Sequence, residues 1–160
     1  MTTTKKLRVI PKEKAVFWLD RYGRWHNEHG PFEHKRIIAY FNAAIQRDKD
    51  GYHLYQETEY GAEKVYFPYE DCVLFAVDLI LDEPVTIILN TGRKIKLMPG
   101  EMSIHDNDLY MQAGEDRIKF IDRSLIKISK IMHFKKDQYH IQVDGKKYHI
   151  PNDESESGDS

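Results

Sequence analysis

Cysteine is scarce in this sequence, and long apolar runs are missing. The single cysteine, Cys72, excludes an internal disulfide, a cysteine-built zinc site and a redox pair. No stretch reaches the roughly 18 apolar residues of a membrane span, because the longest candidate, residues 73–81, contains Asp78. The N-terminal residues also lack the apolar core of a signal peptide. We therefore expect a cytoplasmic protein that has no membrane partner.

Catalytic fingerprints are missing as well. The chain contains no phosphate-binding glycine loop, no Gly-x-Ser-x-Gly nucleophile elbow and no His-Glu-x-x-His zinc motif. The net charge is only −2, so the strongly basic surface of a nucleic-acid or membrane binder is not expected. These absences favour a binding or regulatory module over an enzyme, and we expect no cofactor and no metal.

The composition that remains is that of a folded protein. The chain has 160 residues, of which 41% are hydrophobic and 12% aromatic, and such values indicate a globular domain. Both ends are polar, so we expect residues 1–10 and the acidic tail 152–160 to be disordered. Between them we expect one domain over residues 11–151, with potential sub-parts at 11–81 and 82–151.

Two segments have helical periodicity, and the other apolar runs are short. Apolar residues recur at helical spacing from Phe32 to Arg47, and a shorter helix is expected from Arg123 to His133. The remaining runs are β-prone and are separated by turns that contain glycine or proline. The sequence therefore predicts an α+β fold with two helices and mostly antiparallel sheets.

The last part of the chain predicts a tight hairpin. Asp144-Gly145 lies between two alternating segments, 139–143 and 146–150, and Asp-Gly favours a two-residue type I′ turn. The expected cross-strand pairs are Val143 with Lys146, Ile141 with Tyr148, and His140 with His149. Alternation places Tyr139, Ile141, Tyr148 and Ile150 on the buried face and the two histidines on the outer face. That pair could bind a metal or respond to pH, although exposed hairpin polar residues are the simpler interpretation.

The segment at the start of this hairpin has a weak echo earlier in the chain. Residues 49–54 read Lys-Asp-Gly-Tyr-His-Leu, and residues 136–141 read Lys-Asp-Gln-Tyr-His-Ile. Each segment follows a predicted helix and leads into a hairpin. One interpretation is that the chain contains two similar helix-plus-hairpin halves, and coincidence is the other.

Several polar groups are candidates for a site. Glu57, Glu59, Glu70 and Asp71 lie near the ends of a predicted hairpin, where close carboxylates could support hydrolase-like acid–base chemistry together with a histidine. Solvated strand-end charges are the alternative. Trp25 follows Arg24 and either anchors a ligand or partner or belongs to the core.

Histidines and lysines offer two further alternatives. His26, His29 and His34 could converge on a metal, or they could be surface loop residues. The C-terminal third is rich in lysine and could contact nucleic-acid phosphates; its lysines are Lys127, Lys130, Lys135, Lys136, Lys146 and Lys147. Because Tyr139 and Tyr148 are expected in the core, stacking platforms are missing and nucleic-acid binding is not favoured.

The first half of the chain resembles a known bacterial domain family. Residues 18–25 read Trp-Leu-Asp-Arg-Tyr-Gly-Arg-Trp, residues 51–54 read Gly-Tyr-His-Leu, and residues 70–78 read Glu-Asp-Cys-Val-Leu-Phe-Ala-Val-Asp. This series is similar to the domain-of-unknown-function family number twelve eighty-five over about residues 16–80. The second half departs from the family, because only Arg123 and Leu125 match its arginine-rich segment.

The resemblance implies an α+β fold of two similar parts with a ligand-binding or signalling role, and it implies no established reaction. Carried over by position, the binding residues would be Gly23, Arg24, Trp25, Glu59, Glu70 and Asp71. The leading hypothesis is thus a non-enzymatic module that binds a small molecule or a protein. A hydrolase-like enzyme and a nucleic-acid contact through the lysine-rich third are the alternatives.

Overall fold

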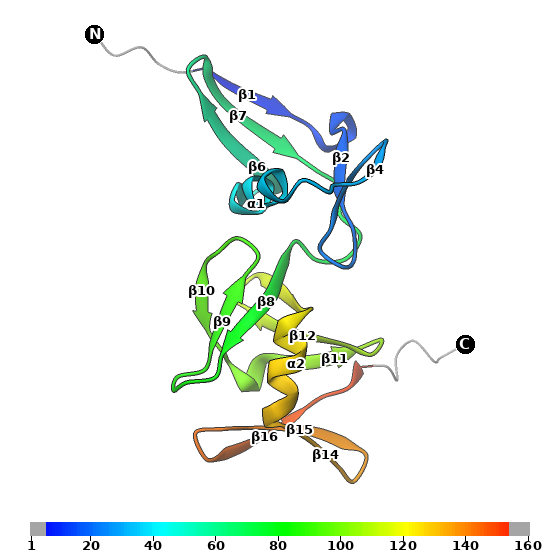
Figure 1. Cartoon of the computed structure of the whole chain (residues 1–160), viewed down its shortest axis with the longest axis vertical. Coiled ribbons are helices and arrows are strands. Elements are labelled where there is room, and N and C mark those ends of the chain that lie inside the picture. The colour runs from blue at the N-terminus through cyan, green and yellow to red at the C-terminus, as the bar shows by residue number, and fades with distance from the viewer. Residues whose placement is uncertain (1–5, 154–160) are drawn as a thin grey trace. The chain divides into compact units, whose positions relative to one another are not determined.

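The computed structural model describes residues 6–153, and the fold is α+β as the sequence predicted (Figure 1). The chain separates into two compact units, Met1–Val73 (unit 1) and Leu74–Ser160 (unit 2). The sequence analysis placed a potential division at residue 81, whereas the strand that begins at Leu74 lies in unit 2. Over residues 6–153, no helix has the length and apolar character needed to cross a bilayer.

Unit 1 is built on a four-stranded sheet in the order β1-β7-β6-β5. Its strands are β1 (Leu7–Ile10), β5 (Ile45–Asp48), β6 (Gly51–Thr58) and β7 (Gly61–Tyr66). Strand β1 runs parallel to β7, with Val9 opposite Lys64. Residues 7–10 are therefore ordered, contrary to the expected disorder of residues 1–10, because the open edge of β7 pairs with their backbone groups. Residues 1–5 lie outside the described part of the chain.

A short helix and a smaller antiparallel sheet lie between β1 and β5 in the chain. The sheet contains β2 (Phe17–Leu19), β3 (Trp25–Asn27) and β4 (Gly30–Pro31), and the one-turn helix η1 covers Lys12–Lys14. In the turn between β2 and β3, the Oδ1 atom of Asp20 accepts the backbone N–H groups of Tyr22 and Arg24. Gly23 has a φ of 81° there, a left-handed value that glycine adopts without steric cost.

Helix α1 (Lys35–Ala43) is shorter at both ends than the predicted helix from Phe32 to Arg47. At its start, the backbone N–H of Phe32 donates to Trp25 O at 2.8 Å and holds that residue against β3. At its end, Ile45 already belongs to β5 and pairs with Leu54 of β6. Pairing between strands thus overrides the helical periodicity that continues through residue 45.

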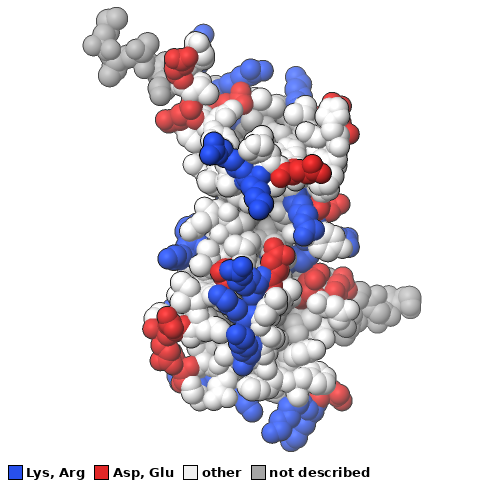
Figure 2. Space-filling model, in the orientation of Figure 1, with Lys and Arg blue, Asp and Glu red and all other residues white. Residues whose placement is uncertain are grey.

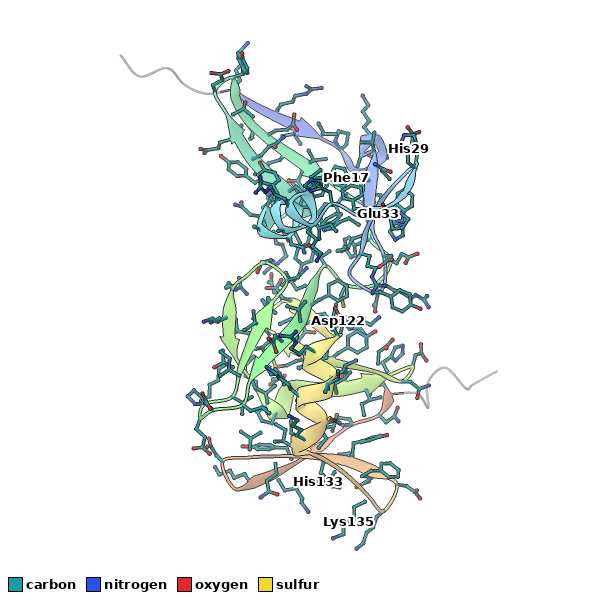
Figure 3. The ribbon with its side chains drawn as sticks, in the orientation of Figure 1. Phe17, His29, Glu33, Asp122, His133 and Lys135 are labelled. Carbon is teal, nitrogen blue, oxygen red and sulfur yellow. The ribbon has the colours of Figure 1, made fainter. Side chains whose placement is uncertain are left out.

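The core of unit 1 is an aromatic cluster around Trp25. The Trp25 ring packs edge-to-face against Phe17, Phe41 and Phe67, with centroid distances of 5.8, 5.3 and 4.9 Å. Phe17, labelled in Figure 3, lies beside α1. Trp25 is 1% exposed, and its indole N–H donates to Asn42 Oδ1 at 2.8 Å. This hydrogen bond satisfies the only polar atom of a ring that is otherwise buried for its apolar area.

Unit 2 contains a six-stranded sheet in the order β10-β9-β8-β13-β12-β11. The strands are β8 (Leu74–Ile80), β9 (Thr86–Leu89), β10 (Lys94–Lys96), β11 (Met102–His105), β12 (Asp108–Ala113) and β13 (Asp116–Phe120), and the one-turn helix η2 covers Pro99–Glu101. All neighbours are antiparallel except β8 and β13, which are parallel.

Helix α2 (Arg123–Ile128) packs on β8 and also ends earlier than predicted. The buried Ser124 fixes its first turn, because its Oγ lies 2.6 Å from Ala76 O and 2.7 Å from Ile121 O. The one-turn helix η3 (Ser129–Ile131) follows, and the chain then enters β14 (Met132–Lys135). His133 therefore lies in a strand and not on the polar side of a helix.

The C-terminal hairpin has the predicted register. Strands β15 (Gln138–Val143) and β16 (Lys146–Ile150) pair Val143 with Lys146, Ile141 with Tyr148, and His140 with His149. Ile141 and Ile150 are buried as expected, but Tyr139 is 37% exposed. Strand β14 adds to the other edge of β15 and completes a three-stranded sheet at one end of α2 (Figure 1).

Asn152 and Asp153, which the sequence analysis assigned to a disordered tail, belong to the described structure. Asn152 forms a bridge with Ile104, and the N–H of Ile104 donates to Pro151 O at 2.8 Å. The rest of the tail, residues 154–160, lies outside the described residues.

Each unit contains a helix that leads into a three-stranded antiparallel meander. Helix α1 precedes β5-β6-β7, and α2 precedes β14-β15-β16. The two echo segments both begin in the first turn of the meander, so His53 and His140 take the same position on the central strand. The two similar helix-plus-hairpin parts that the sequence suggested are therefore present. Each contains three strands, where a hairpin has two.

Candidate functional site

A pocket with a volume of about 630 Å³ lies in unit 1. It is lined at one end of the four-stranded sheet by the β5–β6 turn, by η1 and by the segment that follows β7. The lining residues are Val9, Pro11, Lys12, Glu13, Asp48, Lys49, Asp50, Gly51, Tyr52, Lys64, Tyr66, Phe67 and Tyr69. This set combines an aromatic wall with a small number of lysine and carboxylate groups, as small-molecule sites do.

Strand register brings three polar side chains of this pocket to one face of the sheet. Tyr66 of β7 lies opposite His53 of β6, and Asp48 at the end of β5 lies opposite Gly51. Because side chains alternate along a strand, Asp48, Lys64 and Tyr66 share a face, although Lys64 and Tyr66 follow Asp48 by 16 and 18 residues in the sequence.

The three side chains form a closed hydrogen-bonded group. The ammonium of Lys64 lies 3.0 Å from Asp48 Oδ2, and the phenol of Tyr66 donates to the same oxygen at 2.8 Å. The backbone N–H of Asp50 donates to the other carboxylate oxygen, Oδ1, at 2.9 Å. Asp48 is therefore held as an ionised acceptor by one cation and two neutral donors.

These contacts fix the protonation states of the group. The hydrogen bond from Lys64, followed by those from Tyr66 and Asp50, lowers the pKa of Asp48 far below the usual range of a carboxyl. Burial, and then the hydrogen bond to Asp48, raises the pKa of Tyr66 to about 12. Neither group changes protonation near neutral pH, so the pair suits ligand recognition better than proton transfer.

His53 lies beside this group, directly opposite Tyr66 and on the same face of the sheet. It is 1% exposed, and its Nδ1 lies 3.3 Å from Gly51 O and 3.9 Å from Asp48 Oδ2. Its other ring nitrogen, Nε2, is buried and has no hydrogen-bond partner among residues 6–153. The centroids of the imidazole ring and the Tyr66 ring are 5.0 Å apart, so the two rings pack against each other.

The structure corrects the interpretation of Trp25 as an anchor for a partner. Trp25 is a core residue at 1% exposure, because β3 turns its side chain toward α1. Gly23 and Arg24 lie in the β2–β3 turn, where they serve its geometry through the contacts to Asp20. The sequence could not decide between the core and the surface, since a tryptophan after a turn is compatible with both.

The predicted carboxylate cluster is not assembled. Glu70 Oε1 accepts the backbone N–H of Arg21 at 2.8 Å, so Glu70 and its neighbour Asp71 lie beside the β2–β3 turn. Glu59 lies in the turn that precedes β7, while Glu70 follows the other end of that strand. Five residue steps along β7 separate the two ends by about 17 Å. Glu59 therefore lies apart from Glu70 and Asp71. The carboxylate cluster on which the hydrolase hypothesis depends is not formed.

The histidines of unit 1 do not converge either. His26 Nε2 lies 2.7 Å from Asp20 Oδ2, and His29 Nε2 lies 3.3 Å from Glu28 Oε1. His26 and His29 thus have separate carboxylate partners, while His34 is the N-cap residue of α1. Over residues 6–153, no group of three or more His, Cys, Asp or Glu side chains could hold a metal ion.

The lysine-rich third does not form one basic surface. Lys127 is bound to Asp78 Oδ1 at 2.8 Å and to Leu79 O at 3.0 Å, and its hydrogen bond lowers the pKa of Asp78. Four other lysines lie at opposite ends of the C-terminal sheet β14-β15-β16. Lys135 and Lys136 lie at the β14–β15 turn, and Lys146 and Lys147 follow the β15–β16 turn. On the face drawn in Figure 2, charges of both signs are interspersed.

This region does expose two aromatic side chains, although the sequence analysis expected no aromatic surface for stacking. Tyr139 is 37% and Phe134 61% exposed, and their rings pack 4.7 Å apart. Phe134 lies opposite Tyr139 in the sheet.

The sequence analysis missed the pocket residues Asp48, Lys64 and Tyr66. The predicted helix ended at Arg47, directly before Asp48, and Lys64 and Tyr66 were given no role in a site. The one available signal was the echo at residues 49–54, which marks the turn beside the pocket. Strand register, which brings the three residues together, depends on pairings that a single sequence does not specify.

The fold and the site define a small α+β protein with a ligand-sized pocket in its first unit. A DUF1285 family protein from Silicibacter pomeroyi DSS-3 has a similar structure, with a TM-score of 0.59 and 14% sequence identity over 92% of this chain and 83% of that chain. A DUF1285 family protein from Shewanella baltica OS155 matches with a TM-score of 0.48 and 18% identity over 68% of this chain and 86% of that chain. No family model and no curated protein sequence matches the chain.

The chain therefore resembles the DUF1285 family, as the motifs of its first half predicted. At 14% identity the likeness is one of fold, and it assigns no role to any residue of this chain.

Proposed function

We propose that the protein is a non-enzymatic module of bacterial signalling or regulation that binds a small molecule in the pocket of unit 1. The observation that carries the proposal is the pocket itself, whose volume of about 630 Å³ lies within the range of small-molecule sites, roughly 300–1,000 Å³. The proposed site replaces the surface around Trp25 that the sequence analysis favoured.

The lining residues indicate the chemistry of the ligand. Tyr52 and Tyr69 line the pocket and are not fully buried, so they offer aromatic surface on which a planar ring can pack. Lysines and carboxylates are equal in number among the lining residues, three of each, so the pocket does not select strongly for one sign of charge. We therefore propose a planar ligand whose edge both donates and accepts hydrogen bonds.

The group around Asp48 supports recognition rather than catalysis. Lys64 has three ammonium hydrogens, and its contact with Asp48 leaves others to meet an acceptor on the ligand. Asp48 stays ionised and Tyr66 stays protonated near neutral pH, so both present fixed hydrogen-bonding groups. Preorganised polar groups of this kind give specificity without a change of protonation.

An NMR titration of the ¹⁵N-labelled full chain tests the proposal. Adenosine, guanosine, nicotinamide and tryptophan would be added separately, as planar probes with different hydrogen-bonding edges. We expect one probe to shift the amide signals of Gly51, Tyr52 and Tyr66 and to raise the melting temperature, since a ligand of the native state stabilises it. Shifts that fall outside the lining residues, or none with any probe, would contradict the proposal.

A matched pair of tyrosine variants locates the binding. Tyr69 lines the pocket and is 43% exposed, whereas Tyr60 is 87% exposed and lies in the β6–β7 turn outside this pocket. We expect Tyr69→Ala to weaken binding of the active probe and Tyr60→Ala to leave it unchanged. Equal effects of the two substitutions would place the ligand elsewhere.

A further inference from the structure

Strand β14 forms an open edge of the C-terminal sheet of unit 2. Within residues 6–153 its one neighbouring strand is β15, and no loop of that part of the chain forms a backbone hydrogen bond with residues 133–135. The other outer strand, β16, contacts β11 and η2. An open edge presents backbone donors and acceptors to which a further strand can add.

The turn into β15 shows which backbone groups of β14 face outward. Residues 136 and 137 have φ values of 53° and 60°, as a two-residue type I′ turn requires. Lys135 and Gln138, which flank this turn, are joined by a backbone hydrogen bond, and bonded and non-bonded pairs alternate along an antiparallel ladder. Phe134 therefore belongs to a non-bonded pair, so its backbone N–H and C=O groups point away from β15.

The face of the sheet toward α2 is apolar at this edge. Phe134 and Tyr139 are exposed, and their ring centroids are 4.7 Å apart. Met132 and Tyr139 also line a pocket of about 240 Å³ together with Leu125 and Ile128 of α2. An apolar side chain of an added strand can therefore pack on Phe134 beside apolar neighbours.

The opposite face of the sheet carries positive charge. His133 lies opposite His140, and His140 lies opposite His149, so three histidines cross the sheet on this face. Lys135 and Lys147 are exposed there, and Figure 3 labels His133 and Lys135 on the side that faces away from α2. The other residues of the three strands on this face are two glutamines of β15, so the strands place no carboxylate there.

We propose that the open edge of β14 binds an extended segment of another protein in which apolar and acidic residues alternate. In this mode of recognition, hydrogen bonds between main chains give affinity and alternate side chains give specificity. The apolar residues of the segment contact Phe134 on one face, and its acidic residues lie near His133 and Lys135 on the other. The edge is separate from the pocket in unit 1, so the two proposals stand or fall independently.

Charge and composition distinguish this partner from two other occupants. A second copy of β14, added antiparallel about Phe134, would place Lys135 of one chain opposite His133 of the other, with no carboxylate from either strand between them. Residues 154–160 of the chain itself are acidic but contain no apolar residue to pack on Phe134. Only a segment of alternating character matches both faces of the edge.

An NMR titration of the ¹⁵N-labelled full chain with short synthetic peptides tests the proposal. The probe alternates valine and glutamate, and the two control peptides replace the glutamates by lysines or the valines by serines. We expect the probe to shift the amide signals of residues 132–135 and to slow hydrogen exchange at the outward-pointing amide of Phe134. Both control peptides should bind at least about tenfold more weakly, because each matches only one face.

A matched pair of charge reversals locates the binding. Lys135→Glu should raise the dissociation constant of the probe about five- to tenfold, because an attraction is replaced by a repulsion between like charges. Lys96→Glu is the control, since Lys96 is an exposed lysine of β10, an outer strand of the other sheet in the same unit. Phe134→Ala should weaken binding as well. Lys135 and Phe134 are exposed, so both variants should keep the circular dichroism spectrum of the wild type.

Each of the other outcomes overturns the proposal. No binding of the probe at millimolar concentration, or equal binding of the lysine peptide, would refute the match of the two faces. Equal losses in Lys135→Glu and Lys96→Glu would place the peptide elsewhere. Unchanged exchange at the Phe134 amide in the bound state would exclude strand addition. A dimer in sedimentation whose Phe134 amide is protected without peptide would show that a second copy occupies the edge.

Discussion

The phenol oxygen of Tyr66 lies 2.8 Å from Asp48 Oδ2, on a carboxylate that also binds the ammonium of Lys64 at 3.0 Å. The two residues are 18 positions apart in the sequence and meet only because β5 and β7 flank the same strand, β6. This contact links the polar wall of the pocket to the register of the sheet.

The first prediction concerns the ionisation of Tyr66. Its pKa, raised to about 12 by burial and by the hydrogen bond to Asp48, should fall toward the ordinary value of 10.0 in Asp48→Asn, as measured by ultraviolet titration of tyrosinate. A tyrosine pKa that is higher in the folded than in the unfolded state stabilises the fold at any pH below the unfolded pKa. This contribution is therefore lost as the pH rises from about 10 to about 12. An unchanged Tyr66 titration in the variant would show that Asp48 does not contribute.

The second prediction concerns how Asp48 contributes to the free energy of unfolding at acidic pH. Its folded pKa is lowered, so its contribution to stability is present above the unfolded value of 3.8 and is lost as the pH falls below it. In urea melts from neutral to acidic pH, Asp48→Asn should be destabilised at neutral pH and should lose less stability on acidification than the wild type. Parallel curves for the two proteins would refute the assignment.

A third prediction separates the two tryptophans. Trp25 is 1% exposed in the aromatic core, and Trp25→Ala should lower the free energy of unfolding by about 3–5 kcal/mol through the lost burial and the cavity it leaves. Trp18 is 38% exposed and stacks on His26 at 5.5 Å, so Trp18→Ala should cost clearly less. Urea denaturation followed by tyrosine fluorescence or circular dichroism measures both, and equal losses would contradict the core assignment.

The fourth prediction tests the docking of β1. Gly61 has a φ of 142°, and a Cβ at that position would lie 2.5 Å from the backbone oxygen of Lys6. Gly61→Ala should therefore cost about 1–3 kcal/mol and increase amide exchange in residues 7–10, because the backbone must shift. Gly100 has open space around it and no positive φ, so Gly100→Ala should be neutral or slightly stabilising. Protected β1 amides in Gly61→Ala would disprove the close approach.

The last prediction concerns the hydroxyl that joins α2 to β8. Ser124 is fully buried, and its Oγ can donate its single hydrogen to Ala76 O or to Ile121 O. Ser124→Ala should lower stability by about 1 kcal/mol. Ser129→Ala is the control, since the Ser129 hydroxyl forms a similar bond to Ile126 O at an exposed position. Equal effects of the two substitutions would show that burial does not matter here.

Local signals predicted the parts of the fold that depend on neighbours in the sequence. Asp144-Gly145 fixed the register of β15 and β16, because a two-residue turn leaves only one set of opposite pairs. The echo at residues 49–54 and 136–141 marked the two meanders for the same reason, since each segment contains the turn into the central strand. The motifs of the first half predicted the resemblance in fold that the comparison bears out.

Helix ends were predicted less well, because they depend on partners that are distant in sequence. The apolar pattern of α1 continues through Ile45, but Leu54 pairs with that residue and makes it a strand. In the same way, Met132 pairs with Ile141, and α2 ends before it. The last carbonyl groups of a helix have no partner within the helix, and pairing with a neighbouring strand supplies partners to the residues that follow.

By itself, the sequence determined the fold class, the tight hairpin and the scarcity of known catalytic motifs, because composition, turn chemistry and periodicity act over a few residues. Only the tertiary structure decided that Trp25 belongs to the core, that Glu59 and Glu70 are apart, and that Asp48 meets Lys64 and Tyr66. It also added His133 to the pair formed by His140 and His149. The physical reason is that strand pairing joins residues by register, and register is set by the packing of the whole sheet rather than by adjacent residues.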